Sequence, residues 1–220
     1  MSSDEEKIEY KVVLCGNSAV GKTSIFKKIT TGEFNEKNIS TIGMDKRTIP
    51  IEIDVDEKGI SVKKQVEISL IDTAGQERFK AITKSYYKDS DGVLLIYDIT
   101  KKESYDKLNG WIESIYEALG STQNSQYIIF LIGNKLDLIG VDGKVREVEE
   151  KVAQQKCIEN NMIWGGEYSA KTFTNTQLIE FLTQYVKQIY EKIGPKVVKK
   201  QIVKKIGERK KKKRNKCFFL

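Results

Sequence analysis

The sequence of 220 residues contains no histidine, only two prolines and three cysteines. Cys15, Cys157 and Cys217 are odd in number and widely spaced, without the CxxC pairs or clustered ligands that a zinc site requires. Cys15 and Cys157 are therefore expected to be buried free thiols. No run of about 18 apolar residues is present, so we expect no segment to cross a membrane as a helix.

The N-terminus also lacks the positive charge and apolar stretch of a signal peptide, because MSSDEEKIEY is acidic. The protein is therefore expected to stay on the cytosolic side of membranes. With 39% hydrophobic and 31% charged residues, the chain has the composition of one soluble domain. The net charge of +7 comes from residues 196–216, where twelve basic residues and one acid sum to +11 and leave −4 for the rest. We expect a mildly acidic body with a basic tail.

Hydrophobic patterning predicts an α/β fold. Residues 8–14 form a short apolar run, and alternating apolar residues at 49–55 and 66–70 predict an antiparallel hairpin around the turn DEKG. Pro50 cannot donate a ladder hydrogen bond, which places its strand at a sheet edge. The continuous apolar runs that begin at Gly92 and Tyr127 are typical of parallel strands covered on both faces.

The clearest helical pattern runs from Thr176 to Ile193, where Gly194 and Pro195 are expected to end it. The sequence contains no internal repeat, and its one low-complexity stretch is the basic tail. We expect residues 195–216 to be a flexible polybasic tail, although four-residue spacing of apolar residues from Val198 would also allow an amphipathic surface helix.

A glycine-rich loop follows the first apolar run. Gly16, Gly21, Lys22 and Thr23 fit the pattern GxxxxGK[ST], in which backbone N–H groups point at phosphate oxygens. Lys22 would neutralise the β- and γ-phosphates, and the Thr23 hydroxyl would bind Mg²⁺. Because the loop lies between a predicted strand and a predicted helix, we interpret it as a phosphate-binding site.

The tetrapeptide NKLD, residues 134–137, indicates which base is bound. It follows a buried strand, at the carboxyl edge of the sheet where α/β proteins bind ligands. The Asp137 carboxylate can accept hydrogen bonds from N1–H and the exocyclic amine of guanine, whereas adenine would leave it unpaired. A ligand that leaves a buried charge unpaired is rejected more strongly. We therefore predict that the protein binds GTP or GDP rather than ATP.

Together, these motifs resemble the Rab branch of the Ras-like small GTPases. The motifs occur in the family's order and rough spacing: GNSAVGKT from Gly16, DTAGQERF from Asp72, YYKDSDG from Tyr86, YDIT from Tyr97, NKLD, and SAK from Ser169. The resemblance covers residues 8–194 and implies a three-layer P-loop G domain, with a six-stranded, mostly parallel sheet, one antiparallel edge strand and flanking helices. Residues 1–7 would then be an N-terminal extension.

The resemblance also implies roles for individual residues. Thr41 would reach Mg²⁺ and the γ-phosphate, Asp72 would hold Mg²⁺ through water, and the Gly75 N–H would sense the γ-phosphate. Phe34 would lie edge-on against guanine and the Ala170 N–H would face guanine O6. The full expected nucleotide site comprises Gly16, Asn17, Ser18, Ala19, Val20, Gly21, Lys22, Thr23, Ser24, Phe34, Thr41, Asp72, Gly75, Asn134, Lys135, Asp137, Ser169, Ala170 and Lys171; Thr23, Thr41 and Asp72 are the expected Mg²⁺ residues.

Catalysis is expected to depend on Lys22, Thr41 and Gln76, with Gln76 orienting the attacking water. Asn38 stands where the α subunits of heterotrimeric G proteins carry an internal arginine, so unassisted hydrolysis should be slow, on the order of 10⁻⁴ s⁻¹. The family resemblance implies an exchange factor, a GTPase-activating protein, a GDP-dissociation inhibitor or escort protein, and effectors that read the switch regions, around a monomeric core.

Two positions depart from the family pattern. Lys46 and Ile71 stand where Rab proteins carry a phenylalanine and a tryptophan of an aromatic triad, and only Tyr86 keeps its aromatic ring. The hairpin between the switches is also longer than the resemblance implies. One explanation of the extra length is neutral sequence change in a surface loop that tolerates insertions. The alternative is that the hairpin changes the surface that binds partner proteins.

The last four residues, Cys217-Phe-Phe-Leu, have the C-a-a-X form of a prenylation motif, and a final leucine usually directs geranylgeranylation. One lipid anchors only marginally, so the basic residues 210–216 would supply the second signal at an anionic membrane surface. We expect the protein on the cytoplasmic face of intracellular membranes, with a cytosolic pool.

Three alternatives remain open from the sequence. The basic tail would also suit a nuclear or nucleic-acid-binding protein, but the body is net negative and the tail lacks interleaved aromatic residues, so no nucleic-acid partner is expected. A Ras-like signalling GTPase and a GTP-bound scaffold without turnover are the others. The presence of Asp72 and Gln76 argues against the scaffold. The leading hypothesis is a prenylated Rab-like GTPase of vesicle traffic.

Overall fold

The computed structural model describes residues 6–35, 44–73, 86–120 and 127–199. The strands are β1 (Glu6–Cys15), β2 (Met44–Glu57), β3 (Ile60–Thr73), β4 (Gly92–Asp98), β5 (Ile128–Asn134), β6 (Ile163–Glu167) and β7 (Val197–Lys199). The helices are α1 (Lys22–Thr31), α3 (Lys102–Asp106), α4 (Leu108–Leu119), α5 (Glu150–Glu159) and α6 (Asn175–Ile193), with a short 3₁₀ helix η3 (Leu136–Leu138). Within these ranges no helix is both long and apolar enough to cross a membrane.

Six strands form one sheet in the order β2-β3-β1-β4-β5-β6, and a seventh, β7, pairs with β1. β2 is antiparallel to β3, while β3, β1, β4, β5 and β6 are mutually parallel. The predicted mostly parallel sheet with one antiparallel edge strand is thus confirmed. β2 carries Pro50 and lies at the edge, as the missing N–H of proline requires.

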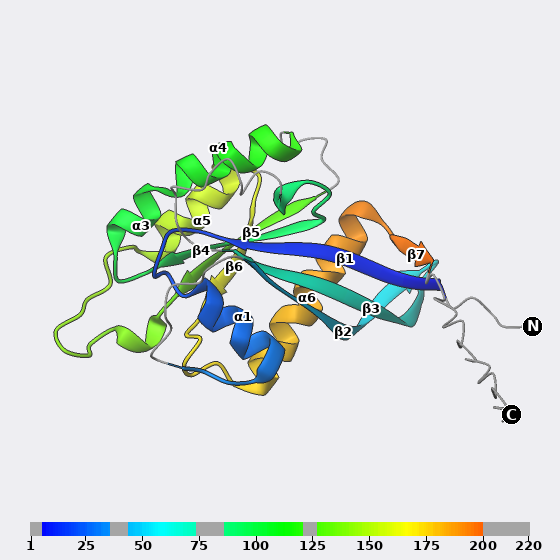
Figure 1. The fold of residues 1–220 in the computed structure, drawn as a ribbon, viewed down its shortest axis with the longest axis horizontal. Helices are drawn as coiled ribbons and strands as arrows, with labels where there is room; N and C mark the ends of the chain where they lie inside the picture. Colours follow the sequence, from blue (N-terminus) through cyan, green and yellow to red (C-terminus); the bar gives the residue numbers. More distant parts are fainter. Residues whose placement is uncertain (1–5, 36–43, 74–85, 121–126, 200–220) are drawn as a thin grey trace, which may run out of the picture.

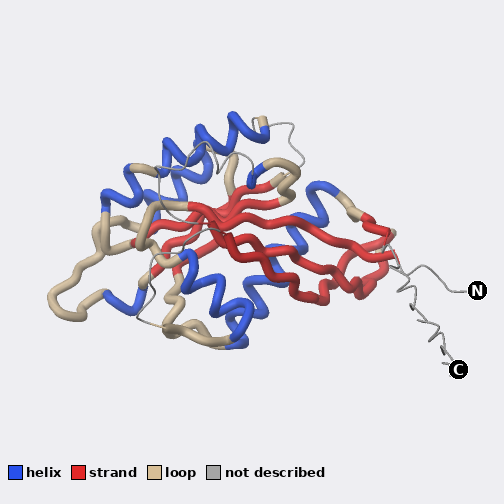
Figure 2. The backbone as a smooth tube through the Cα atoms, viewed as in Figure 1, coloured by secondary structure: helices blue, strands red, loops and turns tan. Residues whose placement is uncertain are grey.

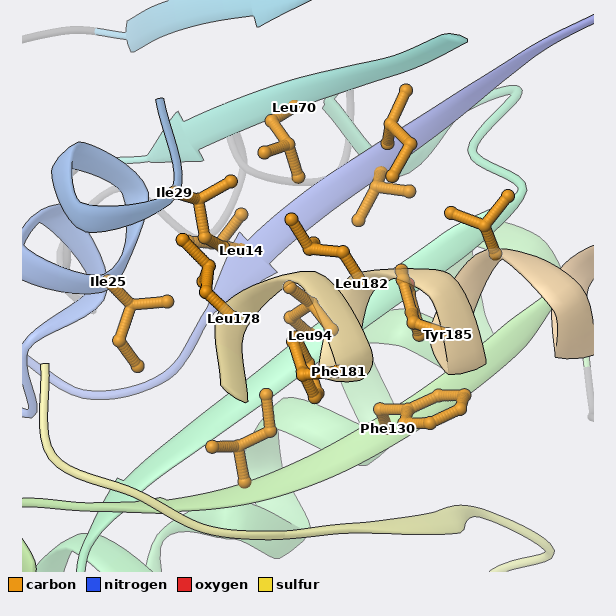
Figure 3. Close-up of a cluster of buried hydrophobic side chains, with 14 of the residues drawn as sticks. Leu14, Ile25, Ile29, Leu70, Leu94, Phe130, Leu178, Phe181, Leu182 and Tyr185 are labelled. Carbon is orange, nitrogen blue, oxygen red and sulfur yellow. The ribbon is translucent and has the colours of Figure 1, made fainter. Parts of the chain in front are cut away.

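Helices cover both faces of the sheet, giving the expected three layers (Figures 1 and 2). α1 and α6 pack on one face, and α3, α4 and α5 pack on the other. Successive residues of β1 divide between the two cores, because side chains of a strand alternate: Val12 and Leu14 face α6, whereas Val13 faces the other layer. Figure 3 shows Leu14, Leu70, Leu94 and Phe130 from four strands pointing at side chains of α6.

The hairpin of β2 and β3 is longer than its alternating apolar residues predict. The two strands pair without interruption from Met44 opposite Thr73 to Glu57 opposite Ile60. The turn is therefore Lys58–Gly59, with φ of 59° and 83°, the positive values that a two-residue type I′ turn requires. The charged stretch is a strand because its other face is buried: Ile53 and Val55 belong to the core that includes α6, which packs on β2.

The C-terminal boundary also differs from the expectation. α6 follows the Thr174 N-cap, one residue earlier than predicted, and Gly194 ends it as predicted. Residues 197–199, expected in the flexible tail, form β7, and residues 6–7, expected in the N-terminal extension, belong to β1. The physical reason is that β4 pairs with β1 only from Val12 onwards, which leaves the edge of Glu6–Ile8 free for β7.

Candidate functional site

The phosphate loop joins the carboxyl end of β1 to the start of α1. Its first residue, Gly16, has φ +134°, and a Cβ there would lie 2.1 Å from the carbonyl oxygen of Ile96 on β4. Glycine is therefore required, because backbone cannot yield to a side chain at this distance. Ala19 adopts a left-handed φ of 62°, which is uncommon outside glycine. The loop is thus fixed in one backbone conformation at the N-terminus of α1. Backbone N–H groups at a helix N-terminus favour binding of an anion.

Lys22 is buried within this loop, with 5% of its surface exposed. Its ammonium group donates to the carbonyl oxygens of Gly16, at 2.8 Å, and Asn17, at 2.7 Å. These contacts hold a buried positive charge inside the loop. The structure thus places this charge in the loop that the sequence predicts to bind phosphate.

Thr23 and Asp72 lie together beside the loop. The Thr23 hydroxyl donates to Asp72 Oδ2 at 2.7 Å, and among the described residues no group donates to the buried Oδ1 atom. Burial raises the pKa of Asp72, and the Thr23 hydrogen bond lowers it in part. A buried carboxylate oxygen without a donor, next to a hydroxyl, is a donor set that suits Mg²⁺. The residues present therefore fit the expected metal.

Asn134 connects three loops at the carboxyl edge of the sheet. Its side-chain nitrogen donates to the carbonyl of Val20 in the phosphate loop at 2.8 Å, and its oxygen accepts from the Ala170 N–H at 3.2 Å. Gly21 makes room for this link, since a Cβ there would lie 2.2 Å from Asn134 Nδ2. Asn134 thereby joins the predicted phosphate-binding and base-binding segments into one site.

The remaining base-site residues lie around this link. Lys135 has a left-handed φ of 73°, and its ammonium group lies 2.8 Å from Asp98 Oδ2 at the end of β4. Asp137 is half-buried in η3, and within the described chain no residue hydrogen-bonds to its carboxylate. The Ser169 hydroxyl accepts from the backbone N–H of Lys171 at 3.1 Å, which fixes that loop. Guanine can therefore approach an available carboxylate.

Comparison with known proteins identifies the family of this chain. The model of the Ras family matches residues 11–191. The chain belongs to the Ras family. It is 38% identical over 197 residues to Ras-related protein Rab-11C of Dictyostelium discoideum, covering 88% of this chain and 80% of that protein. It is 35% identical over 206 residues to Ras-related protein YPTC6 of Chlamydomonas reinhardtii, covering 93% and 87%.

A third relative shows that the same domain occurs within a larger protein. Human EF-hand calcium-binding domain-containing protein 4B is 37% identical over 168 residues, which are 76% of this chain but only 21% of that protein. Rab-11C and YPTC6, by contrast, match along most of their length. This Ras-family chain is a GTPase of the Rab branch, as its motifs indicated.

Several predicted residues of this Rab-branch GTPase lie outside the described residues: Thr41, Gly75, Gln76 and Cys217. Phe34 is described, and its half-buried ring packs against the core that contains α1 and α6. The rest of the predicted nucleotide site surrounds the carboxyl ends of β1, β3, β5 and β6. The structure thus brings together the segments that the sequence predicts to bind phosphate, metal and base.

Two contacts of the site were not anticipated from the sequence. The indole N–H of Trp111, on α4, donates to the side-chain oxygen of Asn17 in the phosphate loop at 2.6 Å. Asp98, which holds Lys135, is almost fully buried and also accepts from the Thr100 hydroxyl at 2.7 Å. The motif YDIT contained Asp98, but no spacing signal links Trp111 to a residue 94 positions away.

Replacing Trp111 with phenylalanine should loosen the phosphate loop. The change removes one neutral hydrogen bond and keeps most of the ring, so we expect a loss of about 1 kcal/mol, or about fivefold faster GDP release. The matched control is Trp164→Phe, which removes an indole hydrogen bond to Glu150 away from the site. Release of fluorescent GDP would check both. Equal release rates for Trp111→Phe and the parent protein would contradict the role of this contact.

Proposed function

We propose that this Rab-branch GTPase switches between GTP- and GDP-bound states and recruits effectors to membranes in vesicle traffic. The observation that carries the proposal is the Asn134 link, which holds the phosphate loop and both predicted guanine loops at one edge of the sheet. Relatives that are named Rab proteins support the vesicle-traffic assignment.

The proposed roles follow from the contacts. Lys22 would release its loop carbonyls and bind the β- and γ-phosphates, and Asp137 would accept two hydrogen bonds from guanine. Thr23 and Asp72, with Thr41, would hold Mg²⁺, which when bound supplies positive charge to the phosphates. Gln76 would orient the attacking water. The chain provides no internal arginine at Asn38, so the unassisted reaction should be slow.

A single-turnover assay with radiolabelled GTP tests this proposal. We expect the parent protein to hydrolyse bound GTP on the order of 10⁻⁴ s⁻¹, and Gln76→Leu to hydrolyse it more slowly without losing GTP affinity. An equal rate in both proteins would remove Gln76 from the mechanism. Tight GTP binding with no hydrolysis by the parent would instead favour the GTP-bound scaffold.

Effectors of this protein should differ from those that recognise an aromatic triad. Lys46 on β2 is exposed and pairs in register with the buried Ile71 on β3. A charged side chain therefore stands between the two switch segments, where the family pattern has an aromatic ring. We propose that exchange factors, activating proteins, escort proteins and effectors of the Rab type act on this chain through a surface altered at Lys46.

We further propose that Cys217 carries a prenyl group and that the basic residues 210–216 add electrostatic attraction to anionic lipids. Lys199, the last described residue, leaves 17 residues before Cys217. The intact mass of protein from its own cells should show loss of residues 218–220 and gain of an isoprenoid.

Replacing Cys217 with serine should abolish stable membrane binding, because the remaining basic tail gives only a salt-sensitive attraction. We expect the variant in the soluble fraction at 0.15 M salt, about the physiological ionic strength, while the parent protein stays partly on membranes. Replacing Cys157, which is buried, with serine is the matched control. Continued membrane sedimentation of Cys217→Ser would refute lipid anchoring at this residue.

A further inference from the structure

The chain between α6 and the basic tail is fastened to the sheet. We call residues 194–199 the strap. The Tyr10 hydroxyl donates to the carbonyl of Gly194 at 2.6 Å, and the Glu9 N–H donates to the carbonyl of Lys196 at 3.1 Å. β7 then pairs with β1 from Val197 opposite Ile8 to Lys199 opposite Glu6. The basic tail therefore begins at a fixed point on the domain.

An ion pair reinforces the strap. The Lys196 ammonium group lies 2.8 and 2.9 Å from the two carboxylate oxygens of Asp91, whose side chain is only 8% exposed. Asp91 also accepts from the backbone N–H of Lys11 at 2.7 Å. Detaching the strap would remove Lys196 from the mostly buried Asp91 carboxylate and leave that charge without an ion-pair partner. This cost stabilises the attached strap.

The strap lies at the end of β1 away from the nucleotide site. β7 pairs with the first residues of β1, whereas the phosphate loop follows the last residue, Cys15. β1 has ten residues, so its two ends lie about 30 Å apart. β7 runs antiparallel to β1 and hence in the direction of β2, toward the turn of the hairpin. Figure 1 shows β7 and this turn at the same end of the molecule.

The β2–β3 pairing continues past the residues that pair with β1, and its turn lies at the same end as β7 (Figure 1). Ile8 pairs with Val66, so Glu6 and its partner Lys199 lie level with Lys64, and residues 60–63 of β3 lead from there back to the turn at Gly59. Ile53 and Val55 anchor the hairpin in the core with α6. The hairpin is therefore packed on the domain close to its turn.

Apolar side chains are exposed at this end among charges that are largely paired. Ile60 is 66% exposed, and Val197 and Val198 are 46% and 41% exposed. Lys63 pairs with Glu52 at 2.6 Å and Lys64 pairs with Glu57 at 2.8 Å. Exposed apolar residues beside the root of a lipid-bearing basic tail suit the boundary between lipid headgroups and acyl chains.

We propose that the end formed by the hairpin turn and β7 lies against an anionic lipid surface, with the nucleotide site facing away from it. The proposal rests on lipid anchoring at Cys217. The 17 residues after Lys199 span up to about 58 Å when extended, so they pass the turn with length to spare. The exposed carboxylates of Asp54 and Asp56 oppose a flat orientation of β2 on anionic lipid, which leaves the turn and β7 as the contact.

The orientation can be tested without relying on cellular prenylation. The full chain is coupled through Cys217 to a maleimide lipid in phosphatidylcholine and phosphatidylserine vesicles, since Cys15 and Cys157 are buried. Ile60→Trp is compared with Val145→Trp, which is equally exposed, at 65%, but lies in the segment between η3 and α5 that follows the predicted base-binding residues. Both variants keep Trp111 and Trp164, so the native emission is the same background in each.

We expect brominated lipids to quench the added emission of Ile60→Trp at least twofold more than that of Val145→Trp. Equal quenching, or none in either variant, would overturn the orientation. Adding Asp91→Asn and Lys196→Gln to Ile60→Trp should reduce the difference, and an undiminished difference would refute the strap as its cause. An unmodified native mass at Cys217 would instead refute the anchor on which the proposal rests.

Discussion

Replacing Asp137 with asparagine should lower GTP affinity by about 10²- to 10⁴-fold and let xanthosine triphosphate bind in its place. Each hydrogen bond to a charged group contributes about 1.5–3 kcal/mol, so losing two costs about 3–6 kcal/mol. The asparagine amide would present donors to the N1–H and amine of guanine, which are donors themselves. Xanthine carries a carbonyl where guanine has the amine, so the amide can donate to it.

The loop around Asp137 should survive this change. The backbone of η3 is held by the Leu136 N–H donating to Tyr168 and by the Leu138 N–H donating to Lys135, and neither bond uses the carboxylate. Competition against labelled GDP with GTP and xanthosine triphosphate measures the shift. Asp142→Asn, at an exposed position in the same segment, is the control. If the GTP affinity of Asp137→Asn stayed within about threefold of that of the parent protein, Asp137 would not be the residue that recognises guanine.

The sequence predicts the parts of this fold whose signals are local. The glycine loop between an apolar strand and a helix, the two continuous apolar runs and the proline at the edge strand each depend on a few neighbouring residues. The hairpin length and β7 depend on tertiary context. Residues 54–64 contain enough charge to suggest a loop, but packing of Ile53 and Val55 beside α6 and cross-strand ion pairs make them strand.

β7 and the connections of the site are harder still to predict. The three residues of β7 have no strand pattern of their own and pair only because β1 extends past β4. Motifs place Lys22, Asp137 and Ala170 in separate loops, but they do not reveal that Asn134 joins those loops across 114 residues to Val20. Such contacts arise from the register of parallel strands, which brings their carboxyl ends to one edge.

Replacing Asp72 with asparagine should have opposite effects on metal binding and on stability. Loss of a carboxylate that orients a metal's shell typically lowers affinity by about 10- to 100-fold, so Mg²⁺ should bind the nucleotide complex that much more weakly. Without metal, however, the protein should gain about 1–3 kcal/mol of unfolding free energy at neutral pH, because a neutral amide replaces a carboxylate whose charged form is disfavoured by burial. Asparagine can still accept the Thr23 hydrogen bond.

The pH dependence follows from the raised pKa of Asp72. The folded protein holds this proton more tightly than the unfolded chain, so the stability contribution is complete below the unfolded pKa and is lost as pH rises through the folded pKa. Urea unfolding in chelator, from about pH 4, near the ordinary pKa of an aspartate, upwards, should therefore show that the advantage of Asp72→Asn grows with pH. Asp106→Asn, an exposed carboxylate on α3, should show no such growth. A variant that loses both Mg²⁺ affinity and metal-free stability would make Asp72 a packing residue, because a group kept for the metal alone should stabilise the protein only when the metal is bound.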